Sequence, residues 1–257
     1  MLFHHRYRVL TQVSSGNQAK VYLVFDETRK LHQILKVYES GRDVGAFLLR
    51  QIENVKALSH PQILVPHSLV QDNPVATVSN VVKGVTLWER AREKGGLDFQ
   101  TAGIFLAQIA NIFDYLNQKQ VVHRDLKPQN IIVDHQNVVY LIDFDAAFFK
   151  RPKLPGMRRT AFFRRMGTSQ YMSPEHLRGE APRAAMDVYA AAVSFYQIMS
   201  LRFPFGDQLQ SREDIANFQP VEFLTKYQNG VLKRSLDPNP AHRLPSVLEL
   251  YKELYRL

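Results

Sequence analysis

The sequence predicts an α+β protein built from a small, strand-rich N-terminal part and a larger, mostly helical C-terminal part. Two observations support this. Up to residue 82, short β-branched and aromatic runs alternate with polar turns, which is typical of antiparallel sheets. From residue 83 onward, apolar residues mostly recur at three- and four-residue spacing, which is typical of amphipathic helices. We therefore expect two lobes, residues 1–82 and 83–257, within a single domain.

The N-terminal lobe is expected to hold one main helix among its strands. Apolar spacing predicts this helix over Ala46–Leu58, and it should end before His60-Pro61, because the residue before a proline disfavours helix. The predicted strands are Tyr7–Val13, Lys20–Phe25, His32–Tyr38, Leu64–Val70 and Val75–Val82.

The C-terminal lobe has its strongest helical pattern at Gln100–Gln118. Two short strands, Ile131–Val133 and Val138–Ile142, flank the turn sequence DHQN. The lobes join near Val81–Gly84, and a ligand cleft would form at such a junction. The other predicted helices are Leu87–Glu93, Asp187–Ser200, Arg212–Asn217, Phe223–Gln228 and Ser246–Tyr255.

The composition excludes several classes of function. The 257 residues include no cysteine, so disulfides, thiolate metal sites and cysteine nucleophiles are excluded. The apolar runs are interrupted well before the roughly 18–20 residues that a membrane span requires. The first residues, MLFHHRYRVL, lack the pattern of a secretory signal. We therefore expect a cytoplasmic protein with no membrane span.

The formal net charge of +9 is partly concentrated in one segment. Residues 150–165 (KRPKLPGMRRTAFFRR) carry seven basic residues and no acidic one. Such a run suits an acidic protein substrate, nucleic acid or simple solvation, and the sequence leaves these three interpretations open.

The strongest chemical signal is the segment His123–Asn130, HRDLKPQN, which lies between the long helix and the two short strands. Thirteen residues after Asn130 comes Asp143-Phe144-Asp145. Phosphoryl transfer needs a carboxylate to orient the attacking hydroxyl, hard oxygen ligands for Mg²⁺ and cations against the phosphates. The residues that supply these groups are Asp125 as the base, Asn130 and Asp143 as metal ligands, and Lys127 with Lys36 as cations.

At these residues the chain resembles the Hanks-type, or eukaryotic-like, Ser/Thr protein kinase family, especially its bacterial members, and the resemblance extends over nearly its whole length. Ile34–Val37 resembles the strand that carries the phosphate-binding lysine. Gly167–Glu175, GTSQYMSPE, resembles the end of the activation segment. Asp187 matches the aspartate that braces the catalytic loop, and Arg243 matches the arginine that pairs with Glu175.

The resemblance implies a bilobal protein-kinase-like fold and a Ser/Thr protein kinase that uses ATP and Mg²⁺, with Mn²⁺ as an alternative metal. Lys127 at its place is typical of Ser/Thr specificity, and Thr168 matches the threonine that helps to seat the acceptor. Asn80–Val82 would offer backbone hydrogen bonds to adenine. The implied nucleotide-binding residues are Val13, Ser14, Gly16, Ala19, Val21, Lys36, Asn80, Val82 and Ile132.

Four features of the sequence depart from the family pattern. The usual three glycines of the phosphate-covering loop fall on Ser14, Gly16 and Ala19, so only one remains. The usual helix glutamate falls on Gln51, which accepts a hydrogen bond from Lys36 but cannot neutralise it. Asp145 replaces a glycine. Finally, Ile34 replaces a small alanine beside the adenine while Ser79 stands near the gatekeeper position.

Regulation is expected to involve the basic segment. Thr160 lies eight residues before Thr168, a spacing at which bacterial members often carry a phosphorylated threonine. Phosphorylated Thr160 would gain charge-assisted bonds from Arg158, Arg159, Arg164 or Arg165. An unmodified threonine in a basic loop is the alternative. Protein substrates and the chain itself are thus the expected partners.

Two other functions share this architecture. One is a pseudokinase, which binds nucleotide or a partner without transferring phosphate at a useful rate. Gln51, Asp145 and the loss of two loop glycines favour it. The presence of the expected catalytic, metal-binding and phosphate-binding residues opposes it; these are Lys36, Asp125, Lys127, Asn130 and Asp143. A small-molecule kinase of the aminoglycoside or choline type is opposed by HRDLKPQN, by GTSQYMSPE and by Arg243. Nucleic-acid binding through the basic run is compatible with kinase activity.

Overall fold

The structure is a computed structural model that describes residues 2–15, 19–38, 44–71, 74–152, 166–206 and 213–256. These residues divide into two compact units. The first contains the described residues up to Lys83 together with Pro152, and the second, from Gly84 onward, contains the others. The fold is α+β: the first unit is an antiparallel sheet with a helix, and the second is mostly helical.

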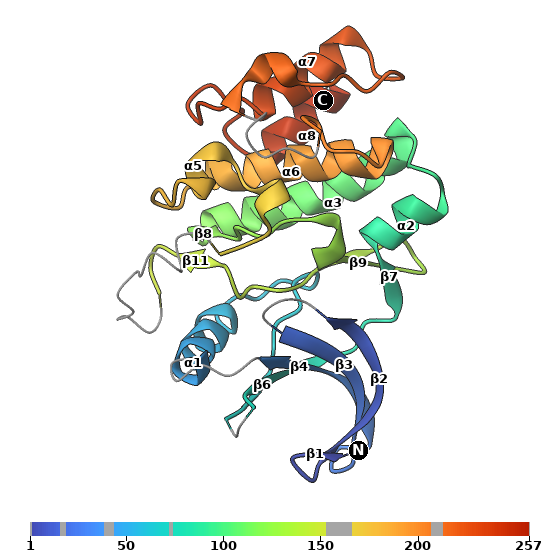
Figure 1. The fold of residues 1–257 in the computed structure, drawn as a ribbon, viewed down its shortest axis with the longest axis vertical. Helices are drawn as coiled ribbons and strands as arrows, with labels where there is room; N and C mark the ends of the chain where they lie inside the picture. The colour runs from blue at the N-terminus through green and yellow to red at the C-terminus, as the bar shows by residue number, and fades with distance from the viewer. Residues whose placement is uncertain are drawn as a thin grey trace. The chain divides into compact units, whose positions relative to one another are not determined.

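The first unit contains a six-stranded antiparallel sheet with the strand order β1-β2-β3-β4-β6-β5 (Figure 1). The predicted strands are confirmed, although Leu64–Val70 is reduced to its last three residues because Pro66 has no amide hydrogen to donate to a neighbouring strand. The strands are β1 (Leu2–Phe3), β2 (Tyr7–Ser15), β3 (Ala19–Asp26), β4 (Leu31–Tyr38), β5 (Ser68–Val70) and β6 (Ala76–Asn80).

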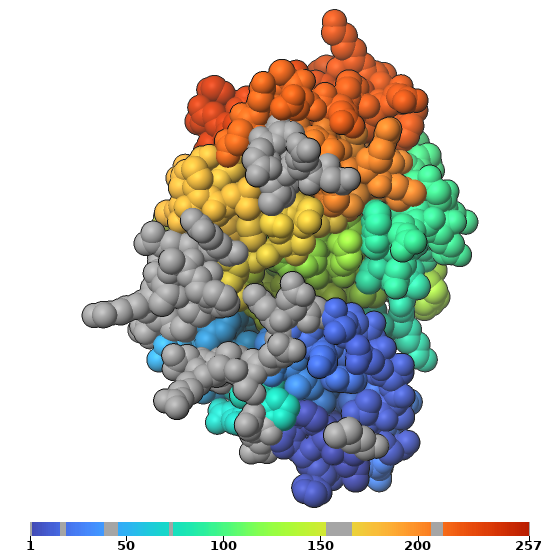
Figure 2. All heavy atoms as spheres, in the orientation of Figure 1, coloured from blue at the N-terminus to red at the C-terminus, as the bar shows by residue number. Residues whose placement is uncertain are grey.

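The sheet of the first unit has two different faces. One face carries a compact apolar cluster of Tyr7, Val24, Leu35, Ala76 and Val78. These residues share a face because side chains alternate along each strand and the strands pair in register. Most side chains of β2 are exposed, and the surface of the first strands is visible in blue in Figure 2.

Helix α1 (Val44–Val55) belongs to the first unit and has a clear apolar face. Leu48, Ile52 and Val55 are buried at the spacing that the sequence predicted. Gln51 is buried on this same face with 8% of its surface exposed, whereas Glu53 points elsewhere and pairs with Lys56. The helix ends three residues before the predicted Leu58.

In the second unit, α3 (Phe99–Gln118) and α6 (Ala184–Ser200) pack against each other, and α8 (Val247–Tyr255) packs on α3 (Figure 1). The ends of these helices follow local capping chemistry. Helix α2 (Leu87–Glu93) begins with a capping box in which Thr86 and Glu89 satisfy each other's backbone amides. In the part of the chain that the structure describes, no helix is both long and apolar enough to span a bilayer.

Two predicted helices are wrong. Within 212–217, the described residues form only a short 3-10 turn, η4 (Ile215–Asn217), because Asp214 caps its first turn and Phe218 is already extended. The helix predicted at Phe223–Gln228 instead begins at Lys226 and continues to Ser235 as α7. Thr225 caps α7 through the Gln228 amide, and this capping box sets its start.

Short strands complete the second unit. β9 (Ile131–Asp134) pairs with β10 (Val139–Leu141), as predicted, and also with β7 (Gly84–Thr86). β8 (Val121–Val122) pairs with β11 (Phe148–Phe149). At Gly84 the two backbones of β7 and β9 approach so closely that a Cβ atom there would lie 2.3 Å from the Val133 carbonyl oxygen. The chain therefore enters the second unit as a strand, although the sequence predicted a change to helix there.

Candidate active site

The loop of residues 123–130 connects β8 to β9 and ends in the 3-10 turn η1 (Pro128–Asn130). The carboxylate of Asp187 on α6 holds the start of this loop. It accepts hydrogen bonds from the backbone amides of His123 and Arg124, each at 2.9 Å. Asp187 is fully buried, and this burial raises its pKa to about 7 even though the two amide donors act in the opposite direction. The Asp187 side chain therefore fixes the backbone at the start of the loop.

Asp125 lies at the centre of a compact polar group. Its Oδ2 accepts hydrogen bonds from Lys127 Nζ at 3.1 Å and from Asn130 Nδ2 at 2.9 Å. Lys127 also donates to the Thr168 hydroxyl at 2.5 Å, which links the loop to the later GTSQY segment. The other carboxylate oxygen, Oδ1, is buried and has no hydrogen-bond partner among the residues that the structure describes. A buried carboxylate oxygen of this kind needs a donor, because leaving it unpaired is costly.

Gly167 forms one wall beside this oxygen. A Cβ atom at position 167 would lie 3.5 Å from Asp125 Oδ1 and only 2.6 Å from the Arg124 carbonyl oxygen. The residue also has a φ of +125°, which side chains rarely allow. Position 167 therefore requires glycine, and the space next to Asp125 depends on it.

Asn130 and Asp143 present the oxygen atoms that could hold a metal ion. The Asn130 amide nitrogen donates to Asp125 O and Oδ2, which leaves the amide oxygen as the acceptor for another group. Asn130 O in turn accepts from Ile142 N, directly before Asp143, at 3.0 Å. An amide oxygen and a carboxylate are hard ligands that suit Mg²⁺. Among the described residues, no group of three or more His, Asp or Glu side chains could hold a metal.

The residues that follow Asp143 pack onto the loop. Phe144 is buried with its ring 4.7 Å from the His123 ring, edge to face. The Arg124 guanidinium donates to the Ala146 carbonyl at 2.8 Å. Asp145, which stands where the family has glycine, donates its backbone amide to Asp143 Oδ1 at 3.4 Å. These contacts connect the HRD and DFD segments within the second unit.

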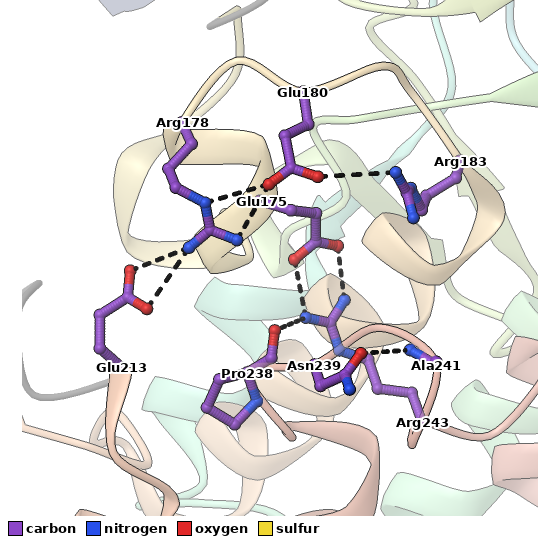
Figure 3. Close-up of polar contacts among 9 residues, drawn as sticks. All are labelled: Glu175, Arg178, Glu180, Arg183, Glu213, Pro238, Asn239, Ala241 and Arg243. Atoms are coloured by element: carbon purple, nitrogen blue, oxygen red, sulfur yellow. Dashed lines mark hydrogen bonds and ion pairs between the residues drawn. The ribbon is translucent and has the colours of Figure 1, made fainter.

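The end of the GTSQYMSPE segment is anchored by a buried ion pair (Figure 3). Arg243 donates two hydrogen bonds of 2.7 Å to the two carboxylate oxygens of Glu175, and both side chains are 0% exposed. Three backbone carbonyls satisfy the remaining guanidinium donors. The pairing that the resemblance implied for Arg243 and Glu175 is therefore present. Around it, Arg178 bonds Glu180 and Glu213 in exposed ion pairs.

The first unit places several predicted nucleotide residues on one face of its sheet. Ser14, Val21, Lys36 and Thr77 are direct cross-strand partners in four neighbouring strands. Ala19 pairs with Tyr38, and Ile34 pairs with Ser79, on the same face. The two positions that differ from the family beside the adenine, Ile34 and Ser79, are thus neighbours.

The remaining predicted residues have less distinctive surroundings. Val13 is 58% exposed, and Asn80 is the exposed last residue of β6. Val82 follows it in an irregular segment, and Ile132 pairs with Thr86 and Tyr140 in the second unit. Gly16 and Thr160 lie outside the described residues, as do the arginines at 158, 159, 164 and 165.

Three residues near these groups had not been singled out from the sequence. The ring of Tyr38 lies beneath the Lys36 ammonium, 5.5 Å from it at the ring centroid. His176 is buried close to Arg124, and burial, aided by the positive charge of Arg124, lowers its pKa to about 4. The Tyr171 hydroxyl lies within hydrogen-bond distance of the side-chain oxygens of Gln129, in loop 123–130, and of Gln197 on α6, and burial raises its pKa to about 12. Alternation along β4 could have indicated Tyr38, but the other two depend on tertiary contacts.

Comparison with known proteins identifies the family. The sequence pattern described as "Protein kinase domain" matches residues 7–256. The chain therefore belongs to the protein kinase domain family.

The similar curated proteins are named as Ser/Thr kinases. CBL-interacting serine/threonine-protein kinase 9 of Arabidopsis thaliana is 30% identical over 246 residues, which cover 93% of this chain and 52% of the relative. Serine/threonine-protein kinase PrkC of Bacillus subtilis is 28% identical, covering 79% and 32%. Serine/threonine-protein kinase PknB of Mycobacterium tuberculosis is 28% identical, covering 98% and 43%. The chain thus spans about half or less of the length of these relatives.

Proposed function

We propose that this chain transfers the γ-phosphoryl group of ATP to serine or threonine hydroxyls of proteins. The observation that carries the proposal is the arrangement around Asp125. One of its carboxylate oxygens is held by Lys127 and Asn130, while the other is buried next to Gly167 and receives no hydrogen bond from the described part of the chain. A substrate hydroxyl would supply that missing donor and would be oriented by it.

The reaction follows from these roles. The hydroxyl oxygen of the acceptor attacks the γ-phosphorus, the bond from phosphorus to the bridging oxygen of ADP breaks, and the hydroxyl proton passes to Asp125. Lys127, between Asp125 and Thr168, places a positive charge beside the transferring group and ties the acceptor-side segment to the loop. Asp125 and Lys127 are therefore the proposed catalytic residues.

ATP and Mg²⁺ fit the available groups. Asn130 and Asp143 would hold Mg²⁺, with Mn²⁺ as an alternative, since both residues offer hard oxygen ligands in one hydrogen-bonded segment. The metal would neutralise charge on the phosphates. Lys36 would bind the phosphates from the first unit. The proposed nucleotide contacts are Val13, Ser14, Gly16, Ala19, Val21, Asn80, Val82 and Ile132.

The protein substrate is proposed to be acidic near its acceptor, because the basic run 150–165 contains no acidic residue. Thr160 within this run is the proposed site of autophosphorylation. Phosphate there would add about two negative charges among four arginines.

The experiment is incubation of the whole chain with ATP, Mg²⁺ and a panel of acidic and basic peptides, followed by mass spectrometry. We expect phosphate on serine or threonine, and on Thr160 of the chain itself. Asp125→Asn should lower the rate by about 10²- to 10⁴-fold, while Asp114→Asn, at a polar site on α3, is the matched control and should retain activity. Equal, negligible incorporation by wild type and Asp125→Asn would contradict the proposal. Retained ATP binding in that case would instead identify a pseudokinase.

A further inference from the structure

Lys36 has an aromatic neighbour on its own strand. Its ammonium lies over the ring of Tyr38, 5.5 Å from the ring centroid. Residues two apart on a strand share a face, so β4 itself brings the cation and the ring together. A cation within about 6 Å of an aromatic centroid is attracted to the ring face, and more strongly where water is excluded.

The ring of Tyr38 is held firmly in place. It is 7% exposed and packs in a small apolar cluster with Ala19 on β3 and Leu48 on α1. Its backbone amide donates to the Val75 carbonyl at 2.9 Å, and its hydroxyl lies 3.5 Å from the Thr77 hydroxyl. Tyr38 therefore connects the strand of Lys36 with helix α1.

One departure from the family pattern packs against this ring, and a second lies on the helix that the ring contacts. Ala19, where the family has a glycine, is the direct cross-strand partner of Tyr38 and contributes its methyl group to the cluster. Gln51, where the family has a glutamate, lies on the buried face of α1 one turn beyond Leu48. Glutamine carries no charge, so an ion pair from this position to Lys36 is chemically ruled out.

We propose that Tyr38 is a positioning residue for Lys36: its ring holds the ammonium in place by a cation–π contact and links it to α1 by packing, in a role that a helix carboxylate would otherwise fill. The inference rests on the proposed function, in which Lys36 binds the ATP phosphates. The ring stabilises the charged lysine without competing for the phosphates, because an aromatic face offers no anion. This cation–π contact acts together with any other contacts of Lys36, and the proposal does not depend on their absence.

The first test varies the ring at position 38 and keeps its shape. Tyr38→Phe should keep the dissociation constant for Mg²⁺-ATP within about twofold of wild type. Phenylalanines that carry increasing numbers of ring fluorines should then be introduced at position 38. They should weaken ATP binding stepwise, to about 3- to 10-fold, because fluorine reduces the negative electrostatic potential of the ring face. Tyr38→Leu should match the most fluorinated variant. An unchanged dissociation constant across the fluorinated series would overturn the proposal.

A matched control exists on α3, where Lys119 lies 5.6 Å from the Tyr115 ring centroid. Tyr115→Leu removes a cation–π pair of similar distance in the second unit and should leave ATP affinity unchanged.

The second test asks whether a carboxylate can replace the ring. Gln51→Glu should reduce the 3- to 10-fold effect of Tyr38→Leu to less than about twofold, since the glutamate would then hold Lys36. Strict additivity of the two substitutions would argue against a shared role.

The third test needs no catalysis and so separates this inference from the proposed function. In protein with isotope-labelled lysine, assigned through Lys36→Arg, the ε-methylene signal of Lys36 should be shifted upfield by the ring and should return to the ordinary position in Tyr38→Leu. An inactive protein that shows this shift would refute the kinase proposal alone. An active protein that lacks it would refute the role of Tyr38 alone.

Discussion

The two units of the chain keep the family pattern to different extents. In the second unit, Asp125, Lys127 and Asn130 match the pattern and form one hydrogen-bonded group that Asp187 supports from α6. In the first unit, the glycine and glutamate positions around Lys36 carry Ala19 and Gln51. The proposed function gives a chemical reason for this difference. In that proposal the second unit supplies particular atoms for proton transfer and metal binding, whereas the first holds a cation, which carboxylates and aromatic rings can both do.

The anchoring of the two units can be compared through one bidentate ion pair in each. Arg243 and Glu175 are both fully buried in the second unit. Arg6 and Asp26 form the corresponding pair in the first, where Arg6 is partly exposed and Asp26 also accepts the backbone amides of Thr28 and Arg29. The buried pair should therefore be the more sensitive to loss of its arginine.

The largest expected effect is that of Arg243→Ala, which would leave the Glu175 carboxylate buried and unpaired. We expect a loss of about 3–5 kcal/mol in the free energy of unfolding, measured by denaturant titration. The control is Arg178→Ala, which removes a 50% exposed arginine three residues after Glu175. It should lower the free energy of unfolding by less than about 1 kcal/mol. Similar losses in both variants would show that burial does not set the strength of this anchor.

A titration should reveal the next largest effect, again in the second unit. The pKa of His176 is lowered from 6.5 to about 4, mainly by burial. Below pH 6.5 the histidine of the unfolded chain binds a proton, whereas His176 of the folded chain stays neutral until about pH 4. The free energy of unfolding should therefore decrease by roughly 3 kcal/mol as the pH is lowered from 6.5 to 4. His176→Gln cannot take up this proton and should show a flatter pH dependence. Parallel curves for the two proteins would contradict the burial of a neutral histidine.

Removing Arg6 from the first unit should have a smaller effect. In Arg6→Ala, the Asp26 carboxylate keeps two backbone donors, so we expect a loss of about 1–2 kcal/mol. Arg6, with the backbone amides, lowers the pKa of Asp26 to about 2. The difference between wild type and Arg6→Ala should therefore persist above pH 4 and shrink as the pH falls toward 2. A loss as large as that of Arg243→Ala would remove the contrast between the units.

The smallest expected effect concerns Ala19. Ala19→Gly restores the residue of the family but removes a methyl group that packs against Tyr38, and it adds backbone freedom to β3. We expect a stability loss of about 1 kcal/mol in a denaturant titration. A gain in stability would mean that the alanine strains the hairpin instead of supporting the ring.

Much of this protein could be predicted from short-range pattern. The strands of the first unit, α2, α3 and α6, and the contiguous loop 123–130 follow local spacing, and their positions agree closely with the structure. The errors fall where local pattern competes with capping or with pairing to distant strands. Thr225 moves the start of α7, and β7 exists only because Gly84–Thr86 pairs with β9.

The sequence alone was sufficient for the class of fold and the family resemblance, because these depend on residue types at short, fixed spacings. The roles of the residues around Asp125 stay a prediction. The burial of Glu175 with Arg243, the lowered pKa of His176 and the burial of the Asp125 Oδ1 atom could be seen only in the folded chain. The same is true of the meeting of Lys36, Tyr38 and Ala19, whose contacts come from strand register and from packing with α1. The physical reason is that burial and contact between distant segments depend on three-dimensional neighbours, which no local pattern contains.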